Sequence, residues 1–318
     1  MGYSWNMDVS VTAADATSRG WRATYLPITS IPWWGLHIGA VYGAIALGVT
    51  WAGLAWCAAM YGVRMFLVTG VYHRYFSHRT YKTSRWFQFV LALLAMMTAQ
   101  KGVLWWAGHH RRHHKHSDTK LDVHSVQHGG FWWSHMGWIM GRDFEGTDAS
   151  VVKDLMKYPE LRVLEKLWFV VPVAVGVAAY LIGGWFGLVW AFAVPQVLSW
   201  HGTFTINSLS HIWGSRRYES GDDSRNNPVL ALITLGEGWH NNHHHYQASA
   251  RQGFFWWEVD ITFYILRGLQ AVGLIWDVRG VPEHVRAGTR KAVAAQRVIA
   301  KPAAEPTPVS AAIAPAEG

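Results

Sequence analysis

Cysteine and charged residues are scarce in this sequence of 318 residues. The single cysteine, Cys57, stands inside an apolar stretch, which excludes a disulfide framework, a cysteine zinc site and an in-chain iron–sulfur cluster. Only 15% of the residues are charged, yet the net charge is +8. In a soluble protein such an excess would raise nucleic acid as a partner. The distribution of charge along this chain indicates a membrane protein instead, with no nucleic acid bound.

Two long apolar blocks explain why charge is scarce. Residues 33–72 contain one charged residue, Arg64, and residues 167–206 contain none. A helix of about 20 apolar residues crosses a bilayer, so each block fits two crossings joined by a tight turn, near residues 48–50 and at residues 183–184. Blocks of this length without polar periodicity argue against a soluble α-protein, because they would leave no wet face. We therefore predict an all-α integral membrane protein with four transmembrane helices, at about residues 33–49, 51–72, 167–182 and 185–206.

Basic residues orient the predicted protein in the membrane. Apart from Arg64, every Lys and Arg lies before residue 33, between residues 73 and 166, or after residue 215. By the positive-inside rule, both termini and the large middle segment are expected in the cytoplasm. Arg64 is costly if it faces lipid, so we expect it to snorkel, to pair inside the helix bundle or to line a tunnel.

The composition divides the chain into three parts. Residues 1–32 are predicted to form a cytoplasmic N-terminal segment and residues 33–280 a single domain. Residues 281–318 are predicted to be a disordered tail, because they are rich in Ala, Pro, Lys and Arg and have little apolar pattern. The short ends and compact loops favour a protein of the bacterial inner membrane.

Histidine is abundant, with 18 in the chain, and clusters at the predicted cytoplasmic ends of helices. His73 and His78 directly follow the second predicted crossing. A spacing of five residues sets two rings about 140° apart on a regular helix, so we expect this pair to straddle a helix end. Asn207 and His211 close the fourth predicted crossing.

Two histidine triplets share one spacing. They are His110, His113 and His114 in one segment, and His240, His243 and His244 in another. Positions i, i+3 and i+4 lie on one face of a helix. Imidazole suits iron, zinc, copper and nickel, and eight or more imidazoles exceed the needs of one ion, so we infer a two-metal site. Asp118, Asp122 and Glu237 lie in or beside the clusters and are expected to fix the ring orientations.

Other interpretations of these residues stay open. The first pair alone would fit an incidental placement, and one triplet alone would fit a zinc site or a solvent-exposed cluster. A metal transporter or sensor is a non-catalytic alternative, although it would place histidines within the membrane-spanning segments. Five histidines are unassigned, with structural or surface roles expected for most of them: His37, His124, His128, His135 and His201.

The three clusters, at residues 73–78, 110–114 and 240–244, resemble the histidine boxes of the membrane-bound fatty-acid desaturases. The similarity is closest to the stearoyl-CoA desaturase branch and covers roughly residues 33–265. It extends to the run Gly-Glu-Gly-Trp-His that ends at His240.

This resemblance implies four transmembrane helices and a cytoplasmic helical cap that holds two iron ions (Fe²⁺). The implied ligands are His73, His78, His110, His113, His114, His211, His240, His243 and His244, with Asn207 bound through water. The implied reaction inserts a cis double bond at the ninth carbon of a saturated C16–C18 acyl chain, most often an acyl-CoA, with O2 and two electrons. Which histidine binds which iron stays open, as do two related activities, those of an acyl-lipid desaturase and of a di-iron hydroxylase.

The resemblance also implies partners and a substrate tunnel in the membrane. The chain has no Gly-rich dinucleotide fingerprint, so we expect a separate electron donor: a ferredoxin, cytochrome b5 or a flavin reductase. Cys57 and Tyr61, one turn apart in the second crossing, are candidates for the closed end of the tunnel. Four basic residues would meet a CoA phosphate, anionic lipid headgroups or an acidic donor: Arg74, Arg111, Arg112 and Lys115.

Overall fold

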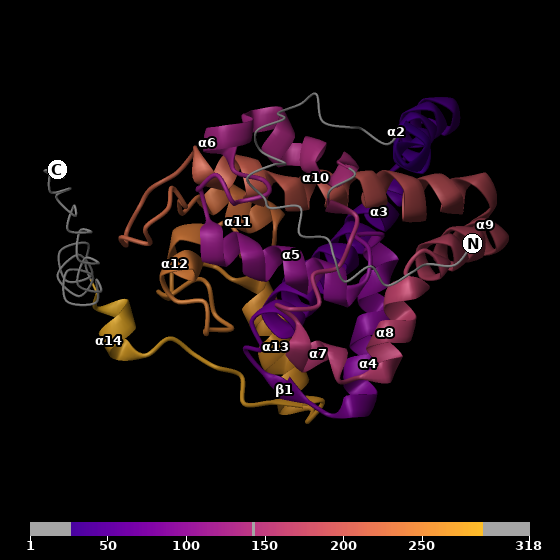
Figure 1. The fold of residues 1–318 in the computed structure, drawn as a ribbon. Helices are drawn as coiled ribbons and strands as arrows, with labels where there is room; N and C mark the ends of the chain where they lie inside the picture. Colours follow the sequence, from indigo (N-terminus) through magenta and orange to yellow (C-terminus); the bar gives the residue numbers. More distant parts are fainter. Residues whose placement is uncertain (1–26, 142–143, 289–318) are drawn as a thin grey trace, which may run out of the picture.

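The computed structural model describes residues 27–141 and 144–288, which form a mostly helical protein (Figure 1). The predicted N-terminal segment is therefore described only from residue 27. The predicted tail is described only for residues 281–288, which include the short helix α14 (Glu283–Arg286). The Arg286 carbonyl accepts a hydrogen bond from the Tyr218 hydroxyl at 2.9 Å. Residues 1–26 and 289–318, and the predictions that fall on them, lie outside the described residues.

The first apolar block forms two helices. Helix α2 (Pro27–Leu47) is followed by α3 (Trp51–Phe66), which continues as the π-helix η2 (Leu67–Ser77). The break at residues 48–50 lies where the sequence predicts a turn. Gly48 has a positive φ of 71° there, and the Thr50 side chain accepts a hydrogen bond from the Gly53 amide at 3.0 Å, which caps α3.

The second block is one helical run with a sharp bend. It comprises α9 (Val170–Gly187), the π-helix η7 (Leu188–Ala193), α10 (Val194–Ser208) and the 3-10 turn η8 (Leu209–His211). Gly184 has φ 58° and ψ −149°, a conformation that glycine adopts readily because it lacks a Cβ. The bend thus falls at the predicted glycine turn.

Two segments of the described chain are long and apolar enough to cross a membrane, Trp51–Ser77 and Val170–His211. A third qualifies if Arg85–Thr98 and Val103–His116, which are bent by 80°, form one span. Length and composition therefore do not support all four predicted crossings. Helix α2 is not long and apolar enough to qualify, and the second apolar block qualifies as one segment where two crossings were predicted. At 1.5 Å per residue, the second run is about 63 Å long, roughly twice the hydrocarbon thickness. Four crossings stay a prediction.

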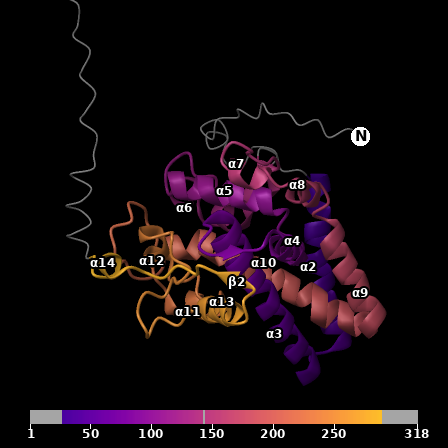
Figure 2. The same ribbon diagram turned by 90° about the horizontal axis from the view of Figure 1, so that it is seen from below.

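We call the remaining elements the cap; they include α4 (Arg85–Ala95) and α5 (Val103–His116), which lie in the candidate third span. In both views α12 and α14 lie on the side opposite α2 and α9 (Figures 1 and 2). A two-stranded antiparallel sheet joins distant parts of the chain, with Lys82–Thr83 (β1) paired to Ile275–Trp276 (β2). The cap helices are α4 (Arg85–Ala95), η3 (Met96–Thr98), α5 (Val103–His116), α6 (Val126–Gly129), η4 (Trp133–Gly137), η5 (Trp138–Met140), α7 (Lys153–Met156), α8 (Pro159–Lys166), α11 (Pro228–Ile233), α12 (His240–His245) and α13 (Ile261–Ala271).

The main apolar core lies between η2, α4 and α5. Tyr72 and Phe76 of η2 and Leu104 of α5 are fully buried in it. This packing holds η2, which carries the first histidine cluster, against α5, which carries the second. The positions of both clusters are therefore set by the same core.

Arg64 lies buried between α3 and α10. Its Nε donates to Gln196 Oε1 at 3.0 Å, and its Nη1 donates to the Met60 carbonyl at 3.2 Å. Of the three expected roles, the structure supports pairing inside the helix bundle, which offsets the cost of a buried charge.

Candidate metal centre

The first histidine pair is placed by the wide turns of η2. His73 lies on its last turn, and His78 is the residue that caps its C-terminal end. The His78 amide donates to the His73 carbonyl at 3.2 Å, which is the i to i+5 bond of a π-helix. The pair therefore straddles a helix end as expected, but the π-helical geometry that brings the rings together was not predicted.

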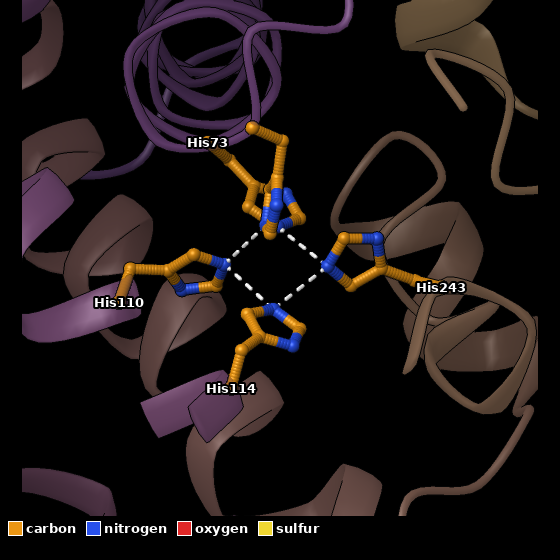
Figure 3. Close-up of side chains that lie close together, drawn as sticks. His73, His110, His114 and His243 are labelled. Carbon is orange, nitrogen blue, oxygen red and sulfur yellow. Dashed lines mark hydrogen bonds between the residues drawn. The ribbon is translucent and has the colours of Figure 1, made fainter. Parts of the chain in front are cut away.

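Five histidines from three segments gather around one centre, and we call them the five-histidine group. Their ligand atoms all lie within 4.8 Å of one another. Four of the rings point their nitrogens toward one another in Figure 3. The members are His73, His78, His110, His114 and His243.

The spacing of these nitrogens fits a metal ion better than a hydrogen-bond network. Neighbouring Nε2 atoms are 3.0 Å apart for His73 and His243, 2.9 Å for His243 and His114, 2.9 Å for His114 and His110, and 2.8 Å for His110 and His78. A neutral imidazole carries one proton, so a single Nε2 cannot donate to two neighbours. Metal–imidazole bonds of about 2.1 Å at right angles would place neighbouring nitrogens about 3.0 Å apart.

Four further histidines form a second centre, the four-histidine group. Its members are His113, His211, His240 and His244, and all four are buried. The Nε2 atoms of His211 and His240 are 3.1 Å apart. The buried Nε2 of His244 has no hydrogen-bond partner among the described residues, which fits an atom that binds a metal.

Each triplet serves both groups, which the sequence left open. The i and i+4 members of the α5 triplet, His110 and His114, belong to the five-histidine group, and His113 belongs to the other. In α12 the assignment is reversed, so that His243 alone joins the five-histidine group. The adjacent residues of each triplet thus hold the two centres side by side.

Carboxylates orient four of the nine rings. The contacts at Nδ1 are His73 with Glu237 at 2.5 Å, His113 with Asp122 at 3.0 Å, His211 with Asp118 at 2.8 Å and His244 with Asp222 at 2.6 Å. A proton held at Nδ1 leaves the lone pair of Nε2 free for a metal. Three of these carboxylates were expected from the sequence. Asp222 was missed, because it stands in a loop far from either triplet and carries no local spacing signal.

The protonation states suit metal binding. Burial lowers the pKa of His240 and His243 well below 6.5, and neighbouring imidazoles lower it further. Both rings are therefore neutral at pH 7. Burial raises the pKa of Asp222, but His244 and the nearby serine hydroxyls lower it by more, so the carboxylate stays ionised.

Arg74 is not exposed to a CoA phosphate, to lipid headgroups or to an acidic donor, the three partners considered from the sequence. It is fully buried, with Nη1 donating to Asp260 at 2.9 Å and Nη2 to Glu237 at 3.1 Å. Asp260 also caps α13 by accepting from the Phe263 amide at 2.9 Å. Arg74 therefore positions Glu237, and through it His73.

The other predicted basic residues lie on the cap. Arg111 pairs with Asp154 at 2.6 Å, and Arg112 lies 3.7 Å from Asp148. Lys115 and Arg111 line a cavity of about 410 Å³ beside His78 and His114. This cavity reaches two members of the five-histidine group, His78 and His114.

The three remaining predicted site residues lie on the long helices. Cys57 is buried against Val189 and Trp190, and the Tyr61 hydroxyl donates to the Ile233 carbonyl at 2.8 Å. Asn207 lies near the end of α10, where its carbonyl accepts from Ser134 Oγ at 2.8 Å. Their roles as tunnel end and as ligand through water stay predictions.

The sequence matches known proteins over most of its length. The family model described as fatty acid desaturase matches residues 49–271. The chain belongs to the fatty acid desaturase family. It is 37% identical over 247 residues to the sn-1 stearoyl-lipid 9-desaturase of Anabaena variabilis. The aligned region covers 77% of this chain and 90% of the relative.

Other desaturase relatives differ in substrate. The chain is 35% identical over 263 residues to the sn-2 palmitoyl-lipid 9-desaturase of Nostoc sp. (strain 36), covering 79% of this chain and 91% of the relative. It is also 35% identical over 255 residues to the acyl-CoA C20 Delta5-desaturase of Anemone leveillei, covering 79% and 80%. Family membership makes the protein an oxidoreductase of lipid metabolism, and the relatives include both acyl-lipid and acyl-CoA desaturases.

Proposed function

We propose that this protein inserts a cis double bond at the ninth carbon of a saturated C16–C18 acyl chain, with two iron ions, O2 and two electrons from a separate donor. The observation that carries the proposal is the division of nine histidines into two adjacent groups. With O2 and two electrons, irons held there would supply the oxidising power to remove hydrogen from unactivated methylene carbons. The carboxylates orient the ligand rings, and most of these rings are buried.

The acyl chain is proposed to be carried by a glycerolipid, with acyl-CoA as the second candidate. Two relatives are named as desaturases of lipid-bound acyl chains at position 9, and the match with this chain extends over about nine tenths of each relative. Arg74, considered from the sequence as a contact for a CoA phosphate, lipid headgroups or an acidic donor, is buried in ion pairs and therefore does not decide between the two carriers. Lys115 at the cavity is the feature that favours CoA.

The proposed membrane arrangement has four crossings, with both termini and the metal centre in the cytoplasm of a bacterium. The exposed apolar side chains on the long helices support it, for instance Trp51 at 88% and Ile182 at 89% exposure, because such surfaces need lipid around them. A ferredoxin, cytochrome b5 or a flavin reductase is the proposed donor.

The test is expression in a desaturase-deficient yeast, followed by gas chromatography with mass spectrometry of each lipid class and double-bond location. We expect 9-monounsaturated chains with the intact protein and none with His243→Ala. His128→Ala is the matched control, since His128 is an exposed residue of α6 outside both groups.

The distribution of product tests the acyl carrier. New double bonds that appear first in intact glycerolipids support the lipid substrate, and bonds that appear first in the acyl-CoA pool support the second candidate. Hydroxylated chains instead of unsaturated ones would contradict the proposal, as would product formation by His243→Ala.

A further inference from the structure

The two histidine groups differ in the carboxylates behind their rings. In the four-histidine group, three of four rings turn Nδ1 toward an aspartate, whereas in the five-histidine group one ring of five meets a carboxylate. The aspartates are Asp118, Asp122 and Asp222, at 2.8, 3.0 and 2.6 Å, and the single glutamate is Glu237. Within the described residues, three ligand rings have a buried Nδ1 without a partner: His114 and His243 in the five-histidine group and His240 in the four-histidine group.

The charges of these carboxylates are also balanced differently. Glu237 shares its charge with the buried guanidinium of Arg74, at 3.1 Å. The ion pairs formed by the three aspartates are all with histidines. Their other hydrogen-bond donors are neutral backbone amides and serine hydroxyls. The carboxylates of the four-histidine group therefore pair with histidines, although the Arg216 guanidinium lies close and donates to the main-chain carbonyl of Asp222 at 2.6 Å.

Access from solvent differs as well. The cavity of about 410 Å³ is lined by His78 and His114, which both belong to the five-histidine group. All members of the four-histidine group are buried. A chelator that enters this cavity therefore meets the five-histidine group first.

We propose that the four-histidine group is the tightly held metal site, that the five-histidine group is the exchangeable one, and that Asp118, Asp122 and Asp222 are positioning residues that cause the difference. Buried carboxylates fix the ring orientation, raise the basicity of the ligands and stabilise the charge of the ion. The inference rests on the proposed function, because it requires iron in both groups.

The test measures iron release instead of turnover. Purified, iron-loaded protein in detergent is mixed with an excess of a coloured ferrous chelator, and absorbance is followed together with the iron content of the protein. We expect two phases of equal size, with the second at least about tenfold slower. Asp222→Asn should speed the slow phase by about 10–100-fold and leave the fast phase unchanged.

Two variants serve as controls. Glu237→Gln should speed the fast phase and leave the slow one unchanged. Asp154→Asn should leave the rates of both phases unchanged, because the ion pair of Asp154 is with Arg111 and not with a ligand histidine. If Asp222→Asn does not fold, Asp118→Asn replaces it, since Asp118 acts on the same group through His211.

The outcomes separate this inference from the proposed function. A single release phase overturns the inference, as does a slow phase that the aspartate variants do not change. In either case the proposed function stands if the purified protein binds two irons. A purified protein that binds no iron overturns the proposed function itself.

Discussion

The metal centre and a second gathering of histidines differ in the direction of their nitrogens. His37 of α2, His201 of α10 and His135 of η4 form a line, with His37 Nε2 3.1 Å from His201 Nε2 and His201 Nδ1 3.0 Å from His135 Nε2. His201 uses both of its nitrogens along this line. At the metal centre each ring directs one nitrogen to a shared point, and four rings turn the other to a carboxylate. Abundance of histidine alone therefore does not indicate a metal site, whereas convergence of the ring nitrogens does.

The surroundings of this three-histidine chain fit a structural role. Its rings lie against aromatic side chains. The ring centroids of Trp33 and His37 are 3.9 Å apart, and Phe131 stacks on His135 with a centroid distance of 5.4 Å. One end closes on the Trp33 carbonyl at 2.8 Å and the other on the Ser208 hydroxyl at 3.0 Å. The three-histidine chain thus ties α2 to α10 and to the η4 segment.

The strongest test of the comparison removes one histidine from each gathering. His113→Ala should lower desaturase activity by more than about 100-fold, because even the outer partners of metal ligands are worth 10–100-fold, and iron content should fall by about half. His201→Ala should keep both irons. Product analysis and elemental analysis measure the two effects, and equal iron loss in both variants would contradict the distinction.

A second test removes Arg74, which pairs with Glu237, the carboxylate behind His73. Arg74→Met should lower the free energy of unfolding by about 3–5 kcal/mol, because it leaves Glu237 and Asp260 buried without their cation. Denaturant unfolding of the metal-free protein measures this. Arg85→Met, which breaks a surface pair with Glu160, is the control, and an equal loss there would show that burial does not decide the effect.

A third test uses pH on the metal-free protein. The folded-state pKa of His240 and His243 lies below the unfolded value of 6.5, so the unfolded chain binds more protons below that pH. Stability is therefore full above pH 6.5 and falls with decreasing pH, by about 1.4 kcal/mol per unit for each such ring. The lowered pKa of Asp222 acts in the same direction only below about pH 3.9. A thermal midpoint that does not change between pH 7 and pH 5 would refute this.

The smallest effect is expected from His201→Gln, which keeps a hydrogen-bonding side chain in the three-histidine chain. Loss of one contact should cost about 1 kcal/mol, with iron content unchanged. Thermal unfolding beside His201→Ala checks it, and a larger loss for the glutamine variant would contradict the structural role.

Much of the site was predictable because its signals are local. The i, i+3, i+4 triplets and the glycines at the two turns specify geometry within a few residues, and the helices break at residues 48–50 and bend at Gly184 as predicted. Partners that meet only through the fold were not predictable. Asp222 reaches His244 across a loop, and the buried pairing of Arg74 depends on the distant Asp260.

The assignment of each triplet to two centres also required the fold. Spacing shows that three rings share a helix face, but the contributions of η2 and η8 decide which ring meets which centre. The four predicted crossings were inferred from apolar length alone, and length alone does not separate two arms of one continuous helical run.

The wide turns of η2 decide where this helix tolerates the loss of one residue. A π-turn holds one residue more than an α-turn, so removing a single residue such as Gly70 would let the segment relax toward α-helix. The narrower turn would take up the missing residue, so the helix upstream would keep its orientation relative to His73 and Arg64 would still face Gln196. A deletion within α3 has no wide turn to absorb it and would rotate the residues on its far side by about 100° relative to His73.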